Sequence, residues 1–431
     1  MTVYFTTLGC KVNQADSDSL LRRMCAAGYA LSPDPWHADV NVLNSCAVTA
    51  ESERKTRQKL RHLRKENPNA ILILTGCAVQ TTQNTAKAYP EADILLGHAD
   101  TQDILHHIEA FSRTKARIDS VSPHQRGEVM SDAPPALPQS RTRGVIKIED
   151  GCDQFCSYCI IPFARGSVRS KPIETIEAEA AAMAAAGLRE AVLVGIHLSA
   201  YGFDNGKNLA DAVDTVSQFN ALKRIRLGSL EPNHLPFDLL ERLAQNDKLC
   251  PQFHISLQSG CNKTLHAMRR CYTAEDYAAI VGKLRTLFPH CAVTTDLMVG
   301  FPGETDADFT ESLAFASRIG FAKMHVFPFS PRPHTPAAGM PMQIPNAVKA
   351  QRSQLSIQRA KAMTQSFLLS QMGTTQEVLT ETPHPDGGMQ GYTRNYTHVR
   401  VRDCSEGNAL VTVKITVAKD GYCEAALCAE Q

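Results

Sequence analysis

Cysteine is the residue type in this chain whose number and spacing point most directly to chemistry. The 431 residues include 14 cysteines, and three of them form the pattern Cys152-x-x-x-Cys156-x-x-Cys159. The first residues lack the basic and apolar regions of a signal peptide, so we expect a cytoplasmic protein, in a compartment where disulfides are rare. The spacing therefore indicates a metal or redox centre.

Three thiolates on one compact loop can hold three irons of a [4Fe–4S] cluster and leave the fourth iron open. An open iron can bind the amino and carboxylate groups of S-adenosylmethionine (SAM), and an electron from the cluster can then break the sulfonium bond. A structural zinc site usually has four ligands in paired C-x-x-C segments. The loop from Cys152 to Cys159 has no such second segment, so the cluster is favoured over structural zinc or merely buried thiols.

Three further cysteines each follow a short apolar segment that we predict to be a strand. The strands are Val3–Thr7, Val40–Leu43 and Ile71–Leu74, and the cysteines that follow them are Cys10, Cys46 and Cys77. The carboxyl ends of strands in an open α/β sheet form one rim, where ligands usually bind. We therefore expect these cysteines to be neighbours that could hold a second cluster, with core cysteines or structural zinc as the alternatives.

The pattern of predicted elements divides the chain into five segments. They are an α/β cluster domain (1–118), a proline-rich linker (119–142), a domain of six strand–helix units (143–345), a connecting helix (346–371) and a small β-barrel (372–431). Six strand–helix units favour a partial or complete parallel barrel, with its chemistry at the carboxyl ends of the strands; a flat doubly wound sheet is the alternative. The last segment alternates polar and apolar residues between glycines, which is typical of a β-barrel.

Composition excludes several classes of protein. The 45 Lys and Arg nearly balance the 44 Asp and Glu, which excludes a histone-like basic protein and an acidic disordered one. No apolar run reaches the length of a membrane span, so we expect no membrane partner.

Several segments of the chain resemble those of a known family. The pattern C-x-x-x-C-x-aromatic-C, with Tyr158 as the aromatic residue, resembles the radical SAM superfamily. The segments TLGCKVNQ (7–14), VLNSCAVT (42–49) and TGCAVQ (75–80) resemble the three cluster segments of the methylthiotransferase family. The segments GIHLSAYG, SLEP, HISLQSG and TTDLMVGFPGET, between 195 and 305, resemble the barrel of the same family, and the tail resembles its TRAM domain.

The resemblance implies an enzyme that modifies tRNA. TLGCKVNQ is most similar to the MtaB type, which acts on threonylcarbamoyladenosine, so the implied reaction is methylthiolation of ring carbon 2 of that nucleoside next to the anticodon. The C–H bond there is neither acidic nor readily displaced, so acid–base catalysis has no means of activating it, and cofactors carry such radical chemistry. The implied cofactors are two [4Fe–4S] clusters and SAM, which serves both as radical source and as methyl donor. An electron donor such as a flavodoxin or ferredoxin, and a sulfur source, are implied partners.

Single residues can be assigned roles on the same basis. Cys152, Cys156 and Cys159 are the expected catalytic cluster ligands. The expected SAM-binding residues, at or near the ends of barrel strands, are Tyr158, Gly195, Glu231 and Gln258. The expected RNA-binding residues, which interleave aromatic and cationic groups in the tail, are Arg394, Asn395, Tyr396 and Arg400. Residues 51–66 hold seven Lys and Arg against three Glu, a net of +4, which suits phosphate contacts or a solvated helix face.

The sequence is also compatible with other functions. Within the family, the substrate could be isopentenyladenosine in tRNA or an aspartate of a ribosomal protein. A non-catalytic RNA-binding protein stabilised by zinc at these cysteines is an alternative of another class. An electron carrier is a third, although the barrel would then be superfluous.

Overall fold

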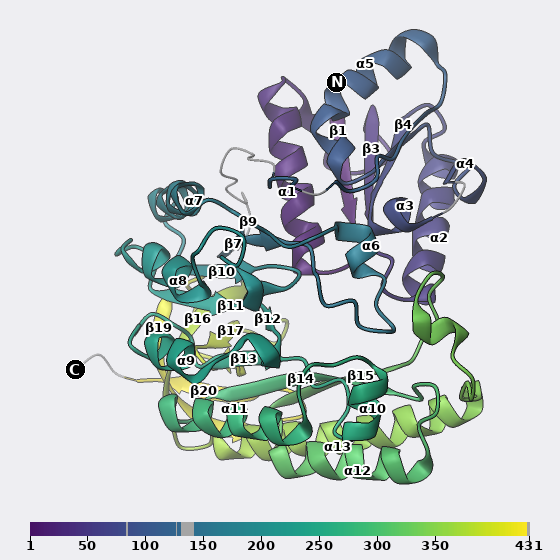
Figure 1. Cartoon of the computed structure of the whole chain (residues 1–431). Coiled ribbons are helices and arrows are strands. Elements are labelled where there is room, and N and C mark those ends of the chain that lie inside the picture. The colour runs from purple at the N-terminus through teal and green to yellow at the C-terminus, as the bar shows by residue number, and fades with distance from the viewer. Residues whose placement is uncertain (83–84, 126, 131–141, 429–431) are drawn as a thin grey trace.

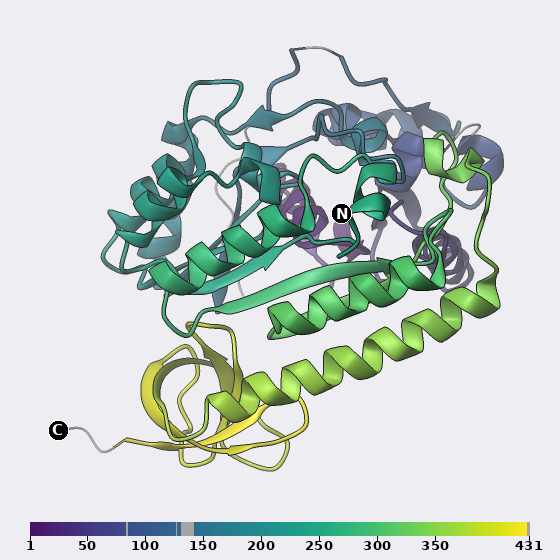
Figure 2. The same ribbon diagram turned by 60° about the horizontal axis from the view of Figure 1, so that its bottom comes forward.

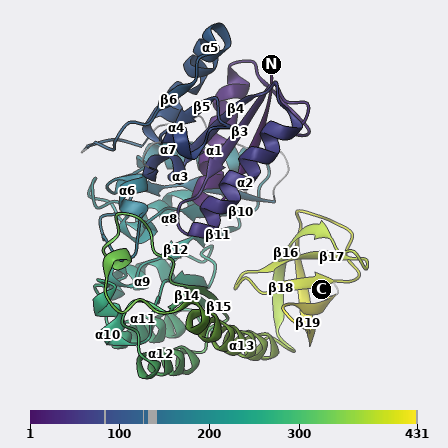
Figure 3. The ribbon, with the colours of Figure 1, turned by 90° about the vertical axis from the view of Figure 1, so that its right-hand side faces the viewer.

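The computed structural model of the chain describes residues 1–82, 85–125, 127–130 and 142–428 (Figure 1). Residues 126 and 131–141 of the predicted linker lie outside the described part. The chain forms an N-terminal sheet, a middle domain of parallel strands and a C-terminal barrel, and Figure 3 shows the sheet above the middle domain and the barrel to one side. None of the described helices is long and apolar enough to cross a membrane.

The N-terminal sheet is parallel and has the order β2-β1-β3-β4-β5-β6. Its strands are β1 (Thr2–Thr7), β2 (Ala30–Leu31), β3 (Val40–Ser45), β4 (Ile71–Gly76), β5 (Ile94–Leu96) and β6 (Ile118–Ser120). Its helices are α1 (Lys11–Ala26), α2 (Ala50–Glu66), α3 (Cys77–Thr81), α4 (Thr85–Ala88) and α5 (Ile104–Thr114). The strand order reverses between β1 and β3, which is where ligands bind in such sheets.

Alternating side chains of the central strands pack on helices of opposite faces. Ile71 and Ile73 of β4 belong to the core formed with α1 and α5, whereas Leu72 and Leu74 belong to the core formed with α2. A strand that is buried on both faces needs a continuous apolar run, which explains the sequence ILIL. The sheet is thereby fixed between two helical layers, with its carboxyl edge toward the middle domain (Figure 1).

The middle domain contains the six predicted strand–helix units in parallel order. One sheet consists of β7 (Arg143–Lys147), β10 (Glu190–Val194) and β11 (Arg224–Leu227); the other consists of β12 (Ser229–Leu230), β13 (Gln252–Ile255), β14 (Ala292–Val299) and β15 (Lys323–Pro328). The third predicted strand runs on past Gly228 and so contributes to both sheets. A parallel bridge between Ile225 and Leu249 lies at this junction. The predicted partial parallel barrel is confirmed.

Helices follow the strands of the middle domain and cover its core. They are α6 (Ile161–Arg165), α7 (Ile173–Ala185), α8 (Leu209–Ser217), α9 (Phe237–Ala244), α10 (Asn262–Ala267), α11 (Ala274–Leu287) and α12 (Asp306–Ile319). Three of them begin with a capping box, in which a side chain accepts from the N3 amide and the N3 Asp accepts in return; the caps are Asn208, Thr273 and Thr305. A small antiparallel pair, β8 (Glu149–Asp150) and β9 (Arg169–Ser170), flanks the cysteine loop.

The C-terminal part is a helix followed by a closed barrel. Helix α13 (Asn346–Ser370) runs beside α12 and leads into the barrel (Figure 2). The barrel strands are β16 (Thr375–Pro383), β17 (Met389–Thr393), β18 (His398–Val401), β19 (Leu410–Ala418) and β20 (Cys423–Leu427), in the order β16-β17-β18-β20-β19. Closure removes the exposed sheet edges of so small a domain. The small TRAM-like barrel expected from the sequence is confirmed.

Candidate functional site

The first set of cysteines lies at the ends of three neighbouring strands. Cys10 follows β1, Cys46 directly follows β3 and Cys77 begins α3 after β4, and these strands pair in the order β1-β3-β4. The carboxyl ends of parallel strands share one edge, so the three side chains converge there. Burial raises the pKa of Cys77 to about 11, and the nearby charges of Cys46 and Cys10 act in the same direction. The proximity predicted for these cysteines is therefore present.

Two glycines allow the strand ends to approach so closely. A Cβ atom on Gly9 would stand 3.1 Å from the Cβ of Cys46. Gly76 has φ +96°, and a Cβ there would stand 2.4 Å from Oδ1 of Asn44 and 2.5 Å from the carbonyl oxygen of Ser45. Gly76 thus leaves no room for a side chain, and a side chain on Gly9 would be tightly packed against Cys46.

A buried pair of asparagines fixes α1 to the end of β3. Asn13 donates from Nδ2 to Oδ1 of Asn44 at 3.2 Å and to the carbonyl of Ser45 at 2.9 Å, and Asn44 donates to the carbonyl of Asn13 at 2.9 Å. The Cys10 thiol donates to Oδ1 of Asn13 at 3.3 Å. Sequence reasoning gave these asparagines no role, although each lies within three residues of a cysteine.

The second set of cysteines lies on the loop between β8 and α6. The loop begins at Gly151, where φ is +91° and a Cβ would stand 2.0 Å from the carbonyl oxygen of Ser167. Backbone hydrogen bonds shape the loop. The Cys152 amide donates to the carbonyl of Gly166 at 2.9 Å, and the Cys159 amide donates to the carbonyl of Cys156 at 3.0 Å. The loop is therefore held compact by contacts close to each cysteine.

The thiols of this loop are in an environment that disfavours bare thiolates. Burial raises the pKa of Cys159 to about 12 and also raises the pKa of Cys152 and Cys156, and the charge of Cys156 adds to the effect at the other two. A bound metal group supplies the positive charge that such thiolates require. Among the described residues, no three His, Cys, Asp or Glu side chains are placed around a single metal ion. A four-iron cluster is wider, because each cysteine binds a different iron, and three cysteines on a compact loop suit it.

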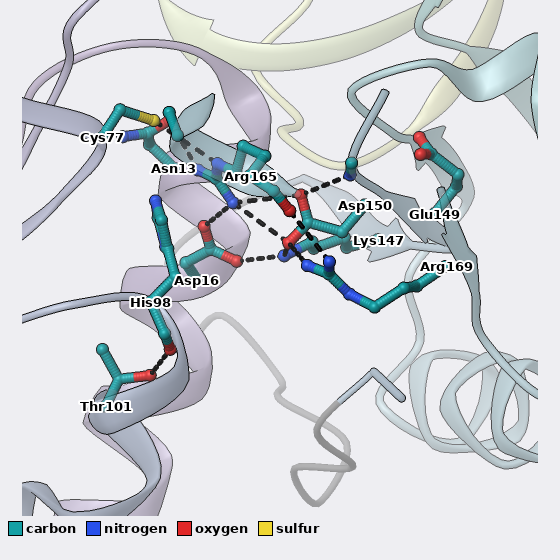
Figure 4. A network of polar contacts seen from close by, with 12 residues as sticks. Asn13, Asp16, Cys77, His98, Thr101, Lys147, Glu149, Asp150, Arg165 and Arg169 are labelled. Carbon is teal, nitrogen blue, oxygen red and sulfur yellow. Dashed lines mark hydrogen bonds and ion pairs between the residues drawn. The ribbon is translucent and has the colours of Figure 1, made fainter. Parts of the chain in front are cut away.

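Arg165 joins the two cysteine sets (Figure 4). This fully buried residue at the end of α6 donates from Nε to the sulfur of Cys77 at 3.4 Å and from Nη2 to Oδ1 of Asn13 at 3.1 Å. Its Nη1 donates to Asp16 at 2.7 Å and contacts Asp150 at 3.3 Å. Helix α6 begins two residues after Cys159, so one side chain connects the loop of the second set with the strand ends of the first.

The carboxylates around Arg165 are kept charged by several cations. Lys147 bridges them, at 2.6 Å from Asp16 and 2.7 Å from Asp150 (Figure 4). Burial alone would raise the pKa of Asp150, but the charges of Lys147, Arg165 and Arg169 outweigh it and lower that pKa. The pKa of Asp16 is lowered in the same way. The contact between the N-terminal sheet and the middle domain is thus a buried ionic network.

A second arginine, Arg270, lies among the predicted SAM-binding residues. Its Nη1 donates to the sulfur of Cys156 at 3.3 Å and to the hydroxyl of Tyr158 at 3.5 Å, and its Nη2 pairs with the carboxylate of Glu231. The half-buried Tyr158 packs against an apolar cluster that includes Met268. The structure therefore brings Tyr158 and Glu231 to the cysteine loop through an arginine that sequence reasoning missed.

The other two predicted SAM-binding residues also lie at strand ends. A Cβ on Gly195 would stand 2.5 Å from Oε2 of Glu149, which accepts from the His197 amide at 2.7 Å. Gln258 has φ +62°, and its backbone N–H donates to the backbone carbonyl of Asp296 at 2.9 Å. The side-chain oxygens Oε1 of Glu149 and of Gln258 are buried and have no hydrogen-bond partner among the described residues. Such acceptors suit the hydroxyl or amino groups of a bound cofactor.

The predicted RNA-binding residues mostly hold the C-terminal barrel in place. Arg394 donates to the carbonyls of Asp247 and Leu249, and Asn395, 4% exposed, donates to Gln371 at 2.9 Å. The hydroxyl of Tyr396 accepts from Arg143 at 2.7 Å, and Arg400 donates to the carbonyl of Gly387 at 3.2 Å. These contacts lie within the chain, so a role in RNA binding stays a prediction that they do not support.

Family models and solved structures define the class of protein. The model of the radical SAM superfamily matches residues 146–316, and that of an uncharacterized protein family, UPF0004, matches residues 2–97. A radical SAM methyltransferase, TsrM of Kitasatospora setae, solved with cobalamin and a [4Fe–4S] cluster, has a TM-score of 0.60 at 13% identity, covering 78% of this chain and 74% of that one. The protein is thus a radical SAM protein, with an α/β domain before its barrel.

Relatives narrow the class to a family. The chain is 37% identical to the threonylcarbamoyladenosine tRNA methylthiotransferase MtaB of Thermotoga maritima (92% of this chain, 90% of the relative) and 36% identical to that of Bacillus subtilis (98% and 94%). It is 34% identical to the tRNA-2-methylthio-N(6)-dimethylallyladenosine synthase of Moorella thermoacetica (97% and 96%). The chain belongs to the family of radical SAM tRNA methylthiotransferases.

Proposed function

We propose that the protein methylthiolates ring carbon 2 of N6-threonylcarbamoyladenosine next to the anticodon of tRNA. The relatives of Thermotoga maritima and Bacillus subtilis, at 37% and 36% identity, carry that substrate in their names. The observation that carries a two-centre reaction is the contact between Arg165 and Cys77, which holds one set of three cysteines against the segment that bears the other. A reaction that inserts sulfur at an unactivated carbon needs both centres near one substrate atom.

Each cysteine set is proposed to hold one [4Fe–4S] cluster. Cys152, Cys156 and Cys159 would hold the cluster that binds SAM, and Cys10, Cys46 and Cys77 would hold the second. When bound, these groups and SAM supply the radical, the sulfur and the methyl group of the reaction. The chain positions them: Arg165 adds positive charge beside Cys77, and Arg270 does the same beside Cys156, which offsets the negative charge of thiolate ligands.

The residues at the strand ends of the middle domain are proposed to orient SAM. Glu231, held by Arg270, and the unpartnered oxygen of Gln258 can accept hydrogen bonds from the ribose. Gly195 admits Glu149 at the end of β10, where the methionine part is proposed to bind, and the ring of Tyr158 can cover the adenine. Fixed polar groups of this kind hold the reacting bond in one orientation.

The proposed partners are tRNA, an electron donor such as a flavodoxin or ferredoxin, and a sulfur source, in the cytoplasm. The second candidate substrate is isopentenyladenosine, because relatives named for dimethylallyladenosine reach 34% identity over nearly the whole chain. The two nucleosides differ in the group on N6, which is anionic in one and apolar in the other.

The test uses the anaerobically reconstituted full chain with SAM, sulfide and a chemical reductant. Two anticodon stem-loops of the same sequence carry either threonylcarbamoyladenosine or isopentenyladenosine, and the nucleosides are identified by mass spectrometry. We expect the 2-methylthio product from the first RNA at a kcat/KM well above that from the second. If only the isopentenyladenosine RNA gave the 2-methylthio product, isopentenyladenosine and not threonylcarbamoyladenosine would be the substrate.

A further inference from the structure

Three cations surround one aromatic ring where the N-terminal sheet, the middle domain and the C-terminal barrel meet. The ring is that of Tyr396, and its centre lies 6.0 Å from Nζ of Lys11, 5.2 Å from the guanidinium carbon of Arg143 and 4.5 Å from that of Arg226. Each distance is in the range of a cation–π contact. The three cations come from α1, β7 and β11, so the cluster forms only when the three parts are assembled.

Two of these cations have a carboxylate partner, and the third does not. Nε of Arg226 lies 2.8 Å from Glu190, and Nε of Arg143 lies 2.9 Å from Glu381. Lys11 is exposed and has no ion pair among the described residues. The cluster therefore carries one uncompensated positive charge, on a lysine that has two further cations close by. An anion bound at Lys11 would balance it.

Lys11 lies directly beside the first cysteine set. It directly follows Cys10 and begins α1, and Cys10 is itself exposed. The next residue, Val12, packs against Val192 and Val194 of β10, so this turn of α1 faces the strands of the middle domain. The lysine is thus adjacent to the first cysteine set, on a turn of α1 that packs against β10 of the middle domain.

We propose that Lys11 binds the free carboxylate of the threonyl group and so selects threonylcarbamoyladenosine over nucleosides with an apolar group on N6. This inference rests on the proposed function. The threonylcarbamoyl group ends in a carboxylate at neutral pH, whereas a dimethylallyl group has no charge. A site built around an ionic hydrogen bond discriminates against a ligand that lacks the partner, because the charge of Lys11, beside Arg143 and Arg226, is then left uncompensated.

A phosphate of the RNA backbone is the other anion that could reach Lys11. Every tRNA substrate carries that phosphate, whatever the group on N6. If Lys11 contacts the carboxylate, replacing the lysine weakens binding only of the RNA that carries the free acid. If it contacts a phosphate, the replacement weakens binding of all RNAs equally. The two sources of the anion can therefore be separated by changing the substrate.

The experiment compares the wild type with Lys11→Met and Lys11→Arg, with Lys361→Met as a control that removes an exposed lysine from α13. The RNAs are one anticodon stem-loop with threonylcarbamoyladenosine and the same stem-loop with the carboxylate converted to its methyl ester. Equilibrium binding is measured by fluorescence anisotropy and the reaction by kcat/KM, with iron content as a check on assembly. The binding measurement does not depend on turnover.

We expect Lys11→Met to weaken binding of the acid RNA by roughly 10- to 100-fold, the range for a hydrogen bond to a charged group. The ester should bind the wild type as weakly as the acid binds Lys11→Met, and Lys11→Arg should restore much of the acid binding. Equal binding of acid and ester by the wild type, or an equal loss with both in Lys11→Met, would overturn the inference. Carboxylate-dependent binding without methylthiolated product would instead count against the proposed function.

Discussion

Replacing Arg165 by Met is expected to weaken the contact between the N-terminal sheet and the middle domain. The side chain is fully buried and pairs with Asp16 at 2.7 Å and Asp150 at 3.3 Å. Removing one partner of a buried ion pair costs about 3–5 kcal/mol, because it leaves a buried charge uncompensated. Lys147 still contacts both carboxylates in the variant, so the expected cost is at the lower end, about 3 kcal/mol.

Hydrogen exchange on the amides of α1 measures this cost locally in the reduced apo-protein. Each 1.4 kcal/mol is about tenfold, so exchange through local opening should become roughly 100-fold faster in Arg165→Met. Arg165→Lys keeps a positive charge at the site, so its exchange should be accelerated less. Arg61→Met is the matched control: Arg61 pairs with Glu91 at 3.0 Å on the surface, and such pairs contribute no more than about 1 kcal/mol. An Arg165→Met effect as small as that of the control would refute the reasoning.

The remaining predictions concern the cysteines, a glycine and a carboxylate. Cys156→Ala should abolish reductive cleavage of SAM, measured as 5′-deoxyadenosine, and cleavage at the wild-type rate would contradict its role. Cys46→Ala should spare that cleavage and stop sulfur insertion, so methylthiolated RNA from this variant would count against the second site. Gly76→Ala should lower the melting temperature and the iron content, because a Cβ would stand 2.4 Å from Asn44; an unchanged protein would disprove the packing argument. Burial alone would raise the pKa of Glu190, but Arg226 and its neighbours lower it below the unfolded value of about 4.3. Its carboxylate therefore stabilises the fold above that value and ceases to do so as the pH falls through the folded pKa. The Glu190→Gln variant should be less stable than the wild type at pH 7 and should lose less of its free energy of unfolding on acidification. A pH profile of unfolding like that of the wild type would exclude this role.

Much of the fold follows from local patterns in the sequence. The strands that precede Cys10, Cys46 and Cys77 are short apolar runs, and parallel strands end at a common edge, so the gathering of these cysteines could be predicted. The loop from Cys152 to Cys159 could be recognised because its ligands are close in sequence. The ends of elements follow less closely, since the strand predicted at Val40–Leu43 continues to Ser45.

The contacts between distant segments could not be predicted. Arg165 and Cys77 are 88 positions apart in the sequence, and Arg270 and Cys156 are 114 positions apart. No local sequence pattern predicts which arginine is buried against a sulfur. The alternation of aromatic and cationic residues at 392–402 predicted an RNA-binding face. In the structure, Tyr396 stacks on Tyr392 and lies against arginines of the middle domain, because the same groups also make good contacts between domains.

Iron and acid-labile sulfide per chain test the central claim most directly. Two four-iron clusters predict about eight irons and about eight sulfides in the anaerobically reconstituted wild type. Replacing Cys10, Cys46 and Cys77 together by Ala should leave about four of each, and so should replacing Cys152, Cys156 and Cys159. A wild type that holds only about four irons, or a triple variant that keeps the full wild-type content, would contradict the account.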